Sequence, residues 1–384
     1  MTKGFIRDSD RLIEAIGEFC SFSDSHDQLH SIVSEILHDI KQNGDDALLE
    51  RTLLYDKASL TASDLPVTEA ELGDARNQLS VSEENSIMDA IKNITLFHEK
   101  SIPENWDTVN LHGAKVGELY YPIRRVGIYV PGGNVPLIST VIMTVTLARV
   151  AKVEEIVVTT PPDSSGMIAP QMLATLDILG VKEIYKIGGA QAIAAMSYGT
   201  ETIPAVDKIF GPGNSFVNEA KRQVYGTVGI DLLPGPSEVM VIADSTANAS
   251  FIAAALLAQA EHGSGKEKIF LLFFDENQYQ EILAEINTQL ETLNHKDAIK
   301  KVLSIGFLAV HLPSLERMAE VANFVAPEHL ELQVDDSNVD YLINNITTAG
   351  AFLVGHMTAT SLGDFLAGPS HVLPTGRSSR FSSG

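Results

Sequence analysis

The last turn of an apolar helical run carries side chains that could bind a metal ion. The stretch LLAQAEHGSG places Gln259 and His262 three residues apart, so both are expected on one helix face. Zinc accepts nitrogen and oxygen ligands, and Asp364, in a glycine-rich segment after the last predicted strand, offers a carboxylate. A simpler explanation is that His262 interacts with the negative end of the helix dipole. The residues by themselves leave both interpretations open.

A second candidate is the pair Glu328-His329 in APEHLEL. Pro327 favours an extended or turning backbone before an apolar strand begins. A histidine beside a glutamate at the mouth of a strand is suited to proton transfer, because histidine titrates near neutrality. A solvated turn explains the same residues, so this pair stays a hypothesis at this level.

Three glycine-containing loops follow predicted strands and precede predicted helices. The dinucleotide signature G-x-G-x-x-G is absent, but YVPGGN, KIGGAQ and FGPGNS each let the backbone approach a phosphate at a helix N-terminus. Glycine after a strand is also typical of a plain turn. The repetition in successive units favours a ligand at this edge without proving one.

The elements that must position these residues alternate between strands and helices. Residues 1–100 are predicted to be helical, with a break at Asn43-Gly44 and a capping box from Thr68 to Glu71. From about residue 124, strand–loop–helix units repeat, and a second series begins at EVMVIAD. We expect an α/β protein with two doubly wound parallel sheets, and an active cleft between them at the carboxyl ends of the strands.

Composition narrows the class of protein. The 384 residues include 27 Lys and Arg against 50 Asp and Glu, and a net charge of −23 makes nucleic acid an unfavourable partner. Cys20 is the only cysteine, which rules out an intrachain disulfide and a cysteine-based zinc site. The longest uncharged apolar stretch, residues 135–148, is too short to span a bilayer. We therefore expect a cytoplasmic protein with no membrane partner.

Seven motifs occur in an order and at a spacing that closely resemble the histidinol dehydrogenase family. They are YVPGG, GGAQAIAA, GPGN followed by EAKRQVYGTVGID, GPSEV, AQAEH, APEHLEL and GDFLAGPSHVLPTG. The likeness runs from about residue 25 to the last residue. It implies a homodimeric enzyme of histidine biosynthesis with two Rossmann-like domains. The implied parts are an N-terminal helical extension (1–24), a first domain with the zinc and catalytic residues (25–128 plus 238–384), and an inserted NAD-binding domain (129–237).

The resemblance also implies roles for individual residues. It implies Gln259, His262 and Asp364 as ligands of one Zn²⁺ per subunit, and Glu328 and His329 as the acid–base pair. The residues that it implies in substrate binding are Ser237, Gln259, His262, His329 and Asp364. Those that match the family's NAD contacts are Tyr129, Gln191 and Asn214. L-Histidinol would be oxidised to L-histidine through L-histidinaldehyde with two NAD⁺, and His329 would act as the base in both oxidations.

One departure from the family pattern lies at the end of the chain. Family members continue past RFSSG with a segment that crosses to the partner subunit and carries a substrate-binding Glu and a zinc-binding His. We expect that a chain without this segment has weak or no activity, whether the sequence is an incomplete record or naturally short. His371 lies nearby in sequence, but the resemblance does not make it a ligand. The alternatives are a zinc and NAD dehydrogenase of another primary alcohol, such as a sulfopropanediol, and an inactive truncated paralogue.

Overall fold

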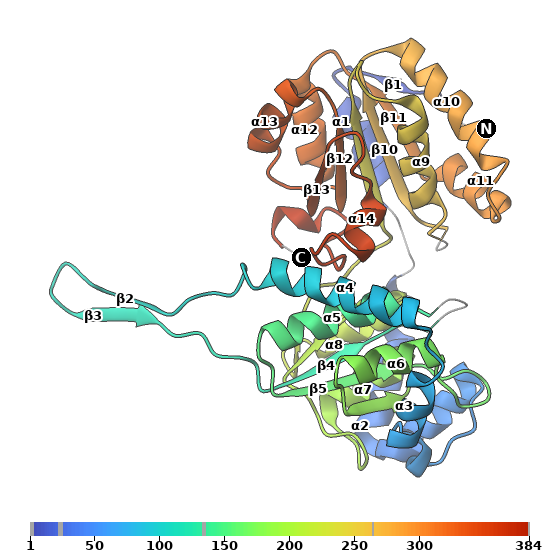
Figure 1. Cartoon of the computed structure of the whole chain (residues 1–384), viewed down its shortest axis with the longest axis vertical. Coiled ribbons are helices and arrows are strands. Elements are labelled where there is room, and N and C mark those ends of the chain that lie inside the picture. Colours follow the sequence, from blue (N-terminus) through green and yellow to red (C-terminus); the bar gives the residue numbers. More distant parts are fainter. Residues whose placement is uncertain (1–3, 22–25, 133–135, 263–264, 383–384) are drawn as a thin grey trace. The chain divides into compact units, whose positions relative to one another are not determined.

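The computed structural model describes residues 4–21, 26–132, 136–262 and 265–382, and its internal contacts divide the chain into two units (Figure 1). Unit 1 comprises Met1–Asp24, Pro234–Asp364 and Leu373–Gly384, and unit 2 comprises Ser25–Leu233 and Phe365–Val372. Each unit contains a fully parallel sheet with helices on both faces, which confirms the predicted α/β class with two Rossmann-like sheets.

Unit 2 is built on a five-stranded sheet in the order β6-β5-β4-β7-β8. Its strands are β4 (Arg125–Tyr129), β5 (Glu155–Thr160), β6 (Glu183–Lys186), β7 (Lys208–Phe210) and β8 (Gly229–Ile230). The helices that connect them are α5 (Ile138–Val150), α6 (Pro170–Ile178), α7 (Gly189–Tyr198) and α8 (Ser215–Val224). All five residues of β4 are buried, as expected for a central strand covered on both faces. The chain order reverses between β4 and β7, where open α/β sheets bind ligands at their carboxyl edge.

Three N-terminal helices complete unit 2. They are α2 (His26–Asp56), α3 (Glu69–Arg76) and α4 (Val81–His98). Within α2, Gly44 leaves the helical conformation at φ 52°, which confirms the predicted break, and a Cβ atom there would lie 2.2 Å from the Glu201 carboxylate. The capping box of Thr68 and Glu71 is also confirmed. α2 packs on α7 and α8, whereas α3 and α4 cover the opposite face of the sheet with α5 and α6.

The division of the chain differs from the one that the resemblance implies. Residues 25–128, expected in the zinc-carrying domain, lie in unit 2, because the apolar faces of α2, α3 and α4 are buried against its sheet and helices. The first 24 residues are not a separate helical extension either. β1 (Ile6–Arg7) pairs in parallel with β11 (Phe307–His311), and α1 (Leu12–Cys20) packs on α12 (Leu315–Val325), so this segment belongs to unit 1.

A β-hairpin that the sequence did not predict extends from unit 2. β2 (Trp106–Val109) and β3 (Lys115–Glu118) pair antiparallel, and Figure 1 shows them projecting beyond the helices of their own unit. Every residue from 99 to 124 is exposed. Asn110 organises the turn, since its side-chain oxygen accepts from the backbone N–H groups of His112 and Ala114.

Unit 1 contains a six-stranded sheet in the order β1-β11-β10-β9-β12-β13. The strands beyond β1 are β9 (Glu238–Ala243), β10 (Lys268–Phe273), β11 (Phe307–His311), β12 (His329–Gln333) and β13 (Ala351–Val354). The helices beyond α1 are α9 (Ala249–Ala260), α10 (Glu276–Leu290), α11 (Lys296–Ile305), α12 (Leu315–Val325), α13 (Asp336–Asn345) and the short α14 (Thr360–Phe365). One face of the sheet is covered by α9, α10 and α11, and the other by α1, α12 and α13. Among the helices in the described ranges, none has both the length and the apolar character needed to cross a membrane.

Candidate active site

Glu328 and His329 lie together at the start of β12. Helix α12 ends where Ala326 adopts a left-handed conformation (φ 51°), and after Pro327 the chain enters the strand. Both side chains are buried, with 5% of Glu328 and 6% of His329 exposed. The backbone N–H of Glu238 donates to Oε2 of Glu328 over 2.9 Å. The first residue of the adjacent strand β9 therefore holds the carboxylate in place.

The same residue of β9 defines the tautomer of His329. Its Nδ1 atom is 3.3 Å from the carbonyl oxygen of Glu238 and 3.7 Å from Oε2 of Glu328. A carbonyl oxygen can only accept, so neutral His329 carries its proton on Nδ1 and has its basic lone pair on Nε2. That nitrogen is 3.7 Å from Oδ1 of Asp364. The solvated-turn alternative does not fit the burial of the pair, whereas its geometry is compatible with proton transfer, which stays a prediction.

Three buried or half-buried carboxyl groups face this site, and each has a raised pKa. Burial raises the pKa of Glu328 well above its usual value, and the nearby Glu238 and Asp364 carboxyls add to this effect. Burial raises the pKa of Glu238 to about 7 against the opposing charge of Lys268. Burial also raises the pKa of Asp364 to about 6, opposed by His262. Such a group of acids favours a bound cation or shared protons.

The residues implied as zinc ligands come from two elements of unit 1. Gln259 lies in the last turn of α9 and is 5% exposed, and its Nε2 atom has no hydrogen-bond partner among the described residues. Because amide oxygen and nitrogen can be exchanged by a flip, this buried group can present either atom to a ligand. His262 follows the helix and is exposed, and its charge acts on Asp364 in α14. Within the described residues no three His, Cys, Asp or Glu side chains form a metal cluster, so the proposed ligand set depends on Gln259.

Two further residues from the sequence analysis are placed by the structure. Ser237 immediately precedes β9, and its carbonyl oxygen accepts from the backbone N–H of Lys268 over 3.1 Å. It is therefore the direct neighbour of Glu238, which holds the acid–base pair. His371 belongs to unit 2, where its Nε2 atom is 3.5 Å from the hydroxyl of Thr140.

The position of the acid–base pair corrects the expected location of the site. A cleft was predicted at the carboxyl ends of the strands, but Glu328 and His329 precede or begin β12 and so lie at the amino edge of the unit 1 sheet. The reason is topological, since the pair occupies a helix-to-strand connection. At the carboxyl edge, Asp244 accepts instead from the backbone N–H groups of Thr246 and Asp335.

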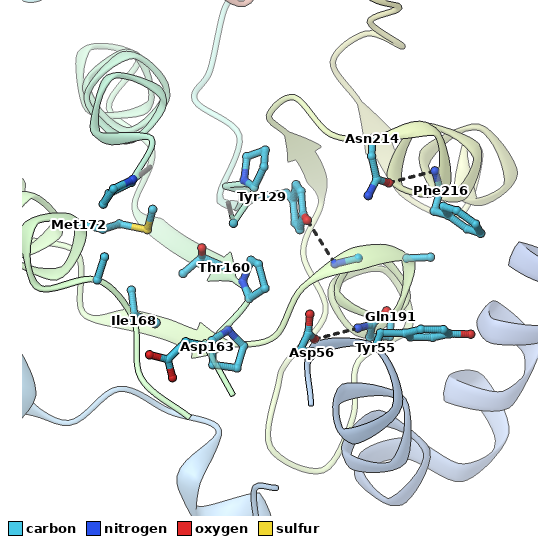
Figure 2. A pocket seen from close by; sticks show the side chains of 18 of the residues that line it. Tyr55, Asp56, Tyr129, Thr160, Asp163, Ile168, Met172, Gln191, Asn214 and Phe216 are labelled. Carbon is cyan, nitrogen blue, oxygen red and sulfur yellow. Dashed lines mark hydrogen bonds between the residues drawn. The ribbon is translucent and has the colours of Figure 1, made fainter. Parts of the chain in front are cut away.

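Unit 2 has a cavity at the carboxyl edge of its sheet, with a volume of about 960 Å³ (Figure 2). Tyr129, at the end of β4, is buried, and its hydroxyl accepts from the N–H of Gly189 over 3.2 Å. Burial raises the pKa of Tyr129 to about 12, so the phenol stays protonated. Gln191, in the first turn of α7, donates through Nε2 to Oδ2 of Asp56 over 3.3 Å. Asn214 caps α8 by accepting from the backbone N–H groups of Phe216 and Val217.

Tyr129, Gln191 and Asn214, which were expected from separate motifs, thus line one cavity. The glycine loop before Asn214 fits closely under β4, because Gly211 has φ +114° and a Cβ atom there would lie 2.1 Å from the carbonyl oxygen of Tyr129. Lys221 is fully buried behind the loop and donates to the Gly211 carbonyl over 2.9 Å. It also pairs with Asp231, whose other oxygen accepts from the Gly211 N–H over 2.8 Å.

Sequence reasoning missed several residues that shape these sites. Glu238 carried a weak signal, as an acid that opens an otherwise apolar strand. Lys221 and Asp231 stood inside a recognised motif but had no assigned role. Asp56 had no sequence signal, because α2 is brought to the cavity by tertiary packing alone.

Known proteins with the same sequence pattern and fold were found by comparison. Histidinol dehydrogenase of Aromatoleum aromaticum is 42% identical over 357 residues, which are 93% of this chain and 81% of that protein. The crystal structure of histidinol dehydrogenase from Elizabethkingia anophelis superposes with a TM-score of 0.93 at 38% identity, covering all of this chain and 87% of the other. An acetylating aldehyde dehydrogenase from Geobacillus thermoglucosidasius shares the fold alone, with a TM-score of 0.51 and 16% identity.

The family comparison covers both units. The sequence model named histidinol dehydrogenase matches residues 21–384, a range that contains the Glu328-His329 pair, the Gln259 and Asp364 side chains, and the cavity around Tyr129. Identity of this extent over nearly the whole chain, together with a superposition of this quality, shows the relationship directly: the chain belongs to the histidinol dehydrogenase family.

Proposed function

We propose that this chain oxidises L-histidinol to L-histidine in two steps, with zinc bound in unit 1 and NAD⁺ bound in unit 2. The observation that carries the proposal is the buried Glu328-His329 pair, which is fixed by Glu238 and has Nε2 of His329 3.7 Å from Asp364. The family membership supports the substrate, an amino alcohol with an imidazole group.

Zinc would be held by Gln259, His262 and Asp364. Two observations fit a cation there: the buried Gln259 amide with an unpartnered nitrogen among the described residues, and the acidic groups with raised pKa values near Asp364. Bound at these residues, zinc would orient the imidazole and amine of histidinol and favour the ionised form of the neighbouring carboxyls. Ser237 and His329 would complete the substrate contacts.

The chemistry of the first step needs a base beside the alcohol. Nε2 of His329 would accept the hydroxyl proton, and NAD⁺, when bound, would supply the acceptor for the hydride from the alcohol carbon, so that the products would be the aldehyde, NADH and one proton. The neutral tautomer described above is suited to this role, because its Nδ1–H is directed to the Glu238 carbonyl and its lone pair lies on Nε2.

The second step oxidises the hydrated aldehyde. Glu328, in its ionised form, accepts a proton from water as the water oxygen adds to the aldehyde carbon. Protonated His329 would return the proton of the first step to the aldehyde oxygen, which completes the hydrate. Neutral His329 would then take a hydroxyl proton of the hydrate, a second NAD⁺ would supply the hydride acceptor, and the products would be the carboxylate, NADH and two protons. Burial of both side chains excludes bulk water and keeps the reactive aldehyde bound.

NAD⁺ would bind the unit 2 cavity through Tyr129, Gln191 and Asn214. The cavity lies at the carboxyl edge of a parallel sheet next to the reversal of chain order, the usual place for a dinucleotide. No described side chain caps α7: the Gly189 N–H donates to the Tyr129 hydroxyl, and the other backbone N–H groups of the first turn would bind an anion at this edge.

We also propose that the chain forms a homodimer in the cytoplasm. The support for dimerisation is the exposed segment 99–124, which presents Trp106, Leu111 and Tyr121 with 49%, 101% and 78% of their surfaces exposed. A lone two-stranded hairpin is marginally stable, and exposed apolar surface of this kind is typical of protein interfaces. The single cysteine fits a reducing compartment.

One set of measurements tests the proposal. Zinc-loaded protein should bind NADH and, even where turnover is as slow as expected from the sequence, release two NADH per L-histidinol consumed, with no NADH formed from a sulfonated propanediol. Sedimentation analysis should give a dimer, and replacement of Trp106, Leu111 and Tyr121 by serine should give monomers. A protein that binds neither zinc nor NADH, or that releases a single NADH per histidinol, would contradict the proposal.

A further inference from the structure

The unit 2 cavity carries a charge pattern that bears on which nicotinamide cofactor it accepts. Among the described residues that line the cavity there are two carboxylates, Asp56 and Asp163, and no lysine, arginine or histidine. A 2′-phosphate carries up to two negative charges and is normally held by an arginine, whereas a ribose 2′-hydroxyl is normally held by a carboxylate. The cavity lining therefore suits the hydroxyl.

The sheet topology indicates which end of the dinucleotide faces these carboxylates. In a doubly wound sheet the diphosphate lies over the first strand, here β4, and the adenosine half lies over the next two strands outward. These strands are β5 and β6 in the order β6-β5-β4-β7-β8. Asp163 follows β5, and Asp56 contacts Gln191 in the helix that follows β6. Both carboxylates thus belong to the adenosine side.

Asp163 occupies the usual position of the ribose-binding acid, but it is exposed, unlike the half-buried Asp56, and one of its two oxygens is committed to its own turn. Its Oδ1 atom accepts from the backbone N–H of Ser165 at 2.8 Å, from the hydroxyl of Ser165 at 2.6 Å and from the backbone N–H of Met167 at 3.0 Å. These bonds fix the loop after β5 and direct that oxygen away from any ligand.

Asp56 is differently placed. It ends α2, is half-buried at the cavity wall, and among the described residues accepts one side-chain hydrogen bond, from Nε2 of Gln191 to Oδ2 over 3.3 Å (Figure 2). Of the described residues, none is placed in hydrogen-bond contact with Oδ1. A carboxylate with one oxygen held by a neighbour and the other facing a cavity is arranged to accept from a diol.

We propose that Asp56 is the residue that selects NAD(H) over NADP(H), by accepting a hydrogen bond from the adenosine ribose and by repelling a 2′-phosphate. The proposal rests on the proposed function of the unit 2 cavity and deepens it. Gln191 supports Asp56 as a positioning residue, since its amide fixes the orientation of the carboxylate.

The test compares cofactor preference across variants at pH 8, where the Asp56 carboxyl is ionised because its pKa, raised by burial, is about 6. NADH and NADPH binding are measured by fluorescence titration of the full chain. In the unaltered protein NADH should bind at least ~100-fold more tightly than NADPH. Asp56→Asn removes the charge with little change of shape, and it should lower this preference about tenfold or more, as expected for loss of a charge-assisted hydrogen bond. Asp56→Ser provides a second variant if the first is unstable.

Two controls make the result specific. Asp46→Asn removes an exposed carboxylate from the same helix and should leave the preference within twofold. Asp163→Asn should lower the thermal stability of the protein but leave the preference for NADH over NADPH nearly unchanged. The proposal is overturned if Asp56→Asn and Asp56→Ser keep the full preference, or if Asp163→Asn is the variant that loses it. Binding of neither cofactor by the unaltered protein would overturn the proposed cavity function as well, so the two failures are distinguishable.

Discussion

The backbone N–H of Glu238 and the side chain of Glu328 are joined by a 2.9 Å hydrogen bond across the adjacent strands β9 and β12. Through its carbonyl oxygen, Glu238 also holds Nδ1 of His329 at 3.3 Å. A single peptide position at the amino edge of the sheet therefore orients both members of the proposed acid–base pair, and the proposed chemistry would depend on the register of β9 against β12.

Glu328→Gln should separate the two oxidation steps. The amide keeps the shape and an acceptor for the Glu238 N–H, but it cannot take a proton from water. We expect the first hydride transfer to keep at least a tenth of its rate while formation of histidine falls about 100-fold or more. Single-turnover experiments would then show one NADH per histidinol rather than two. Equal slowing of both hydride transfers would assign Glu328 a different role.

His329→Asn should nearly abolish turnover. The first step loses its base, and general base assistance is typically worth about 100- to 10,000-fold in rate. Zinc content and NADH affinity should change little, which separates a loss of chemistry from a loss of structure. A decrease in turnover of less than about threefold would remove His329 from the mechanism.

Asp364→Ala should weaken zinc binding. The variant removes an anionic ligand, so we expect the zinc dissociation constant to rise by about tenfold or more. The matched control is Asp340→Ala, a change to an exposed carboxylate on α13 of the same unit. Zinc content after dialysis against a graded chelator series measures the effect without an activity assay. Unchanged zinc retention in Asp364→Ala would exclude Asp364 from the ligand set.

The sequence predicted the elements better than their assembly. Alternating strand and helix patterns were sufficient for the two parallel sheets, and local signals located the Gly44 break and the Thr68–Glu71 capping box. The assignment of residues 25–128 was wrong because long-range packing, which no local pattern encodes, decides where α2, α3 and α4 are buried.

The candidate site, like the fold, could be predicted from the sequence only in part. Glu328 and His329 were found from their chemistry, yet the edge of the sheet was mispredicted from a general rule about α/β folds. That edge could have been read from the order of elements, since a residue between a helix and its following strand must lie at the amino end of that strand. Asp56 could not be found, because it meets Gln191 only after α2 has packed on α7.

Glu219 predicts a loss of stability in acid. Burial raises the pKa of its carboxyl, but hydrogen bonds from Arg222, Gln223 and His30 outweigh burial and lower the pKa from 4.5 to about 2. A lowered pKa stabilises the fold above the unfolded value near 4.5, and this contribution is lost as the pH falls toward 2.

The matching variant is Glu219→Gln. It should lower the free energy of unfolding by about 1–3 kcal/mol at pH 7, in line with loss of hydrogen bonds to a charged group. Because the unaltered protein loses this contribution in acid, the difference between the two proteins should shrink between pH 4.5 and pH 2. Urea titrations at pH 7, 4.5 and 3 measure it, and a constant difference would assign the stabilisation to packing instead of charge.

Lys221→Met should damage NADH binding through the glycine loop. The fully buried ammonium and Asp231 hold the carbonyl and the N–H of Gly211, which lies under Tyr129 and leads into Asn214. Removal of the cation leaves Asp231 buried without its partner, a change that typically costs about 3–5 kcal/mol of stability. Where folding is retained, the dissociation constant for NADH should rise while zinc affinity in unit 1 stays the same.

In a double-mutant cycle Asp231→Asn should recover part of the lost stability in the Lys221→Met background, because it removes the unpaired charge. NADH affinity should remain weak in the double variant, because neither new side chain can hold both backbone groups of Gly211. Full recovery of NADH affinity would show that charge balance, and not the position of the loop, is what the Lys221–Asp231 pair supplies.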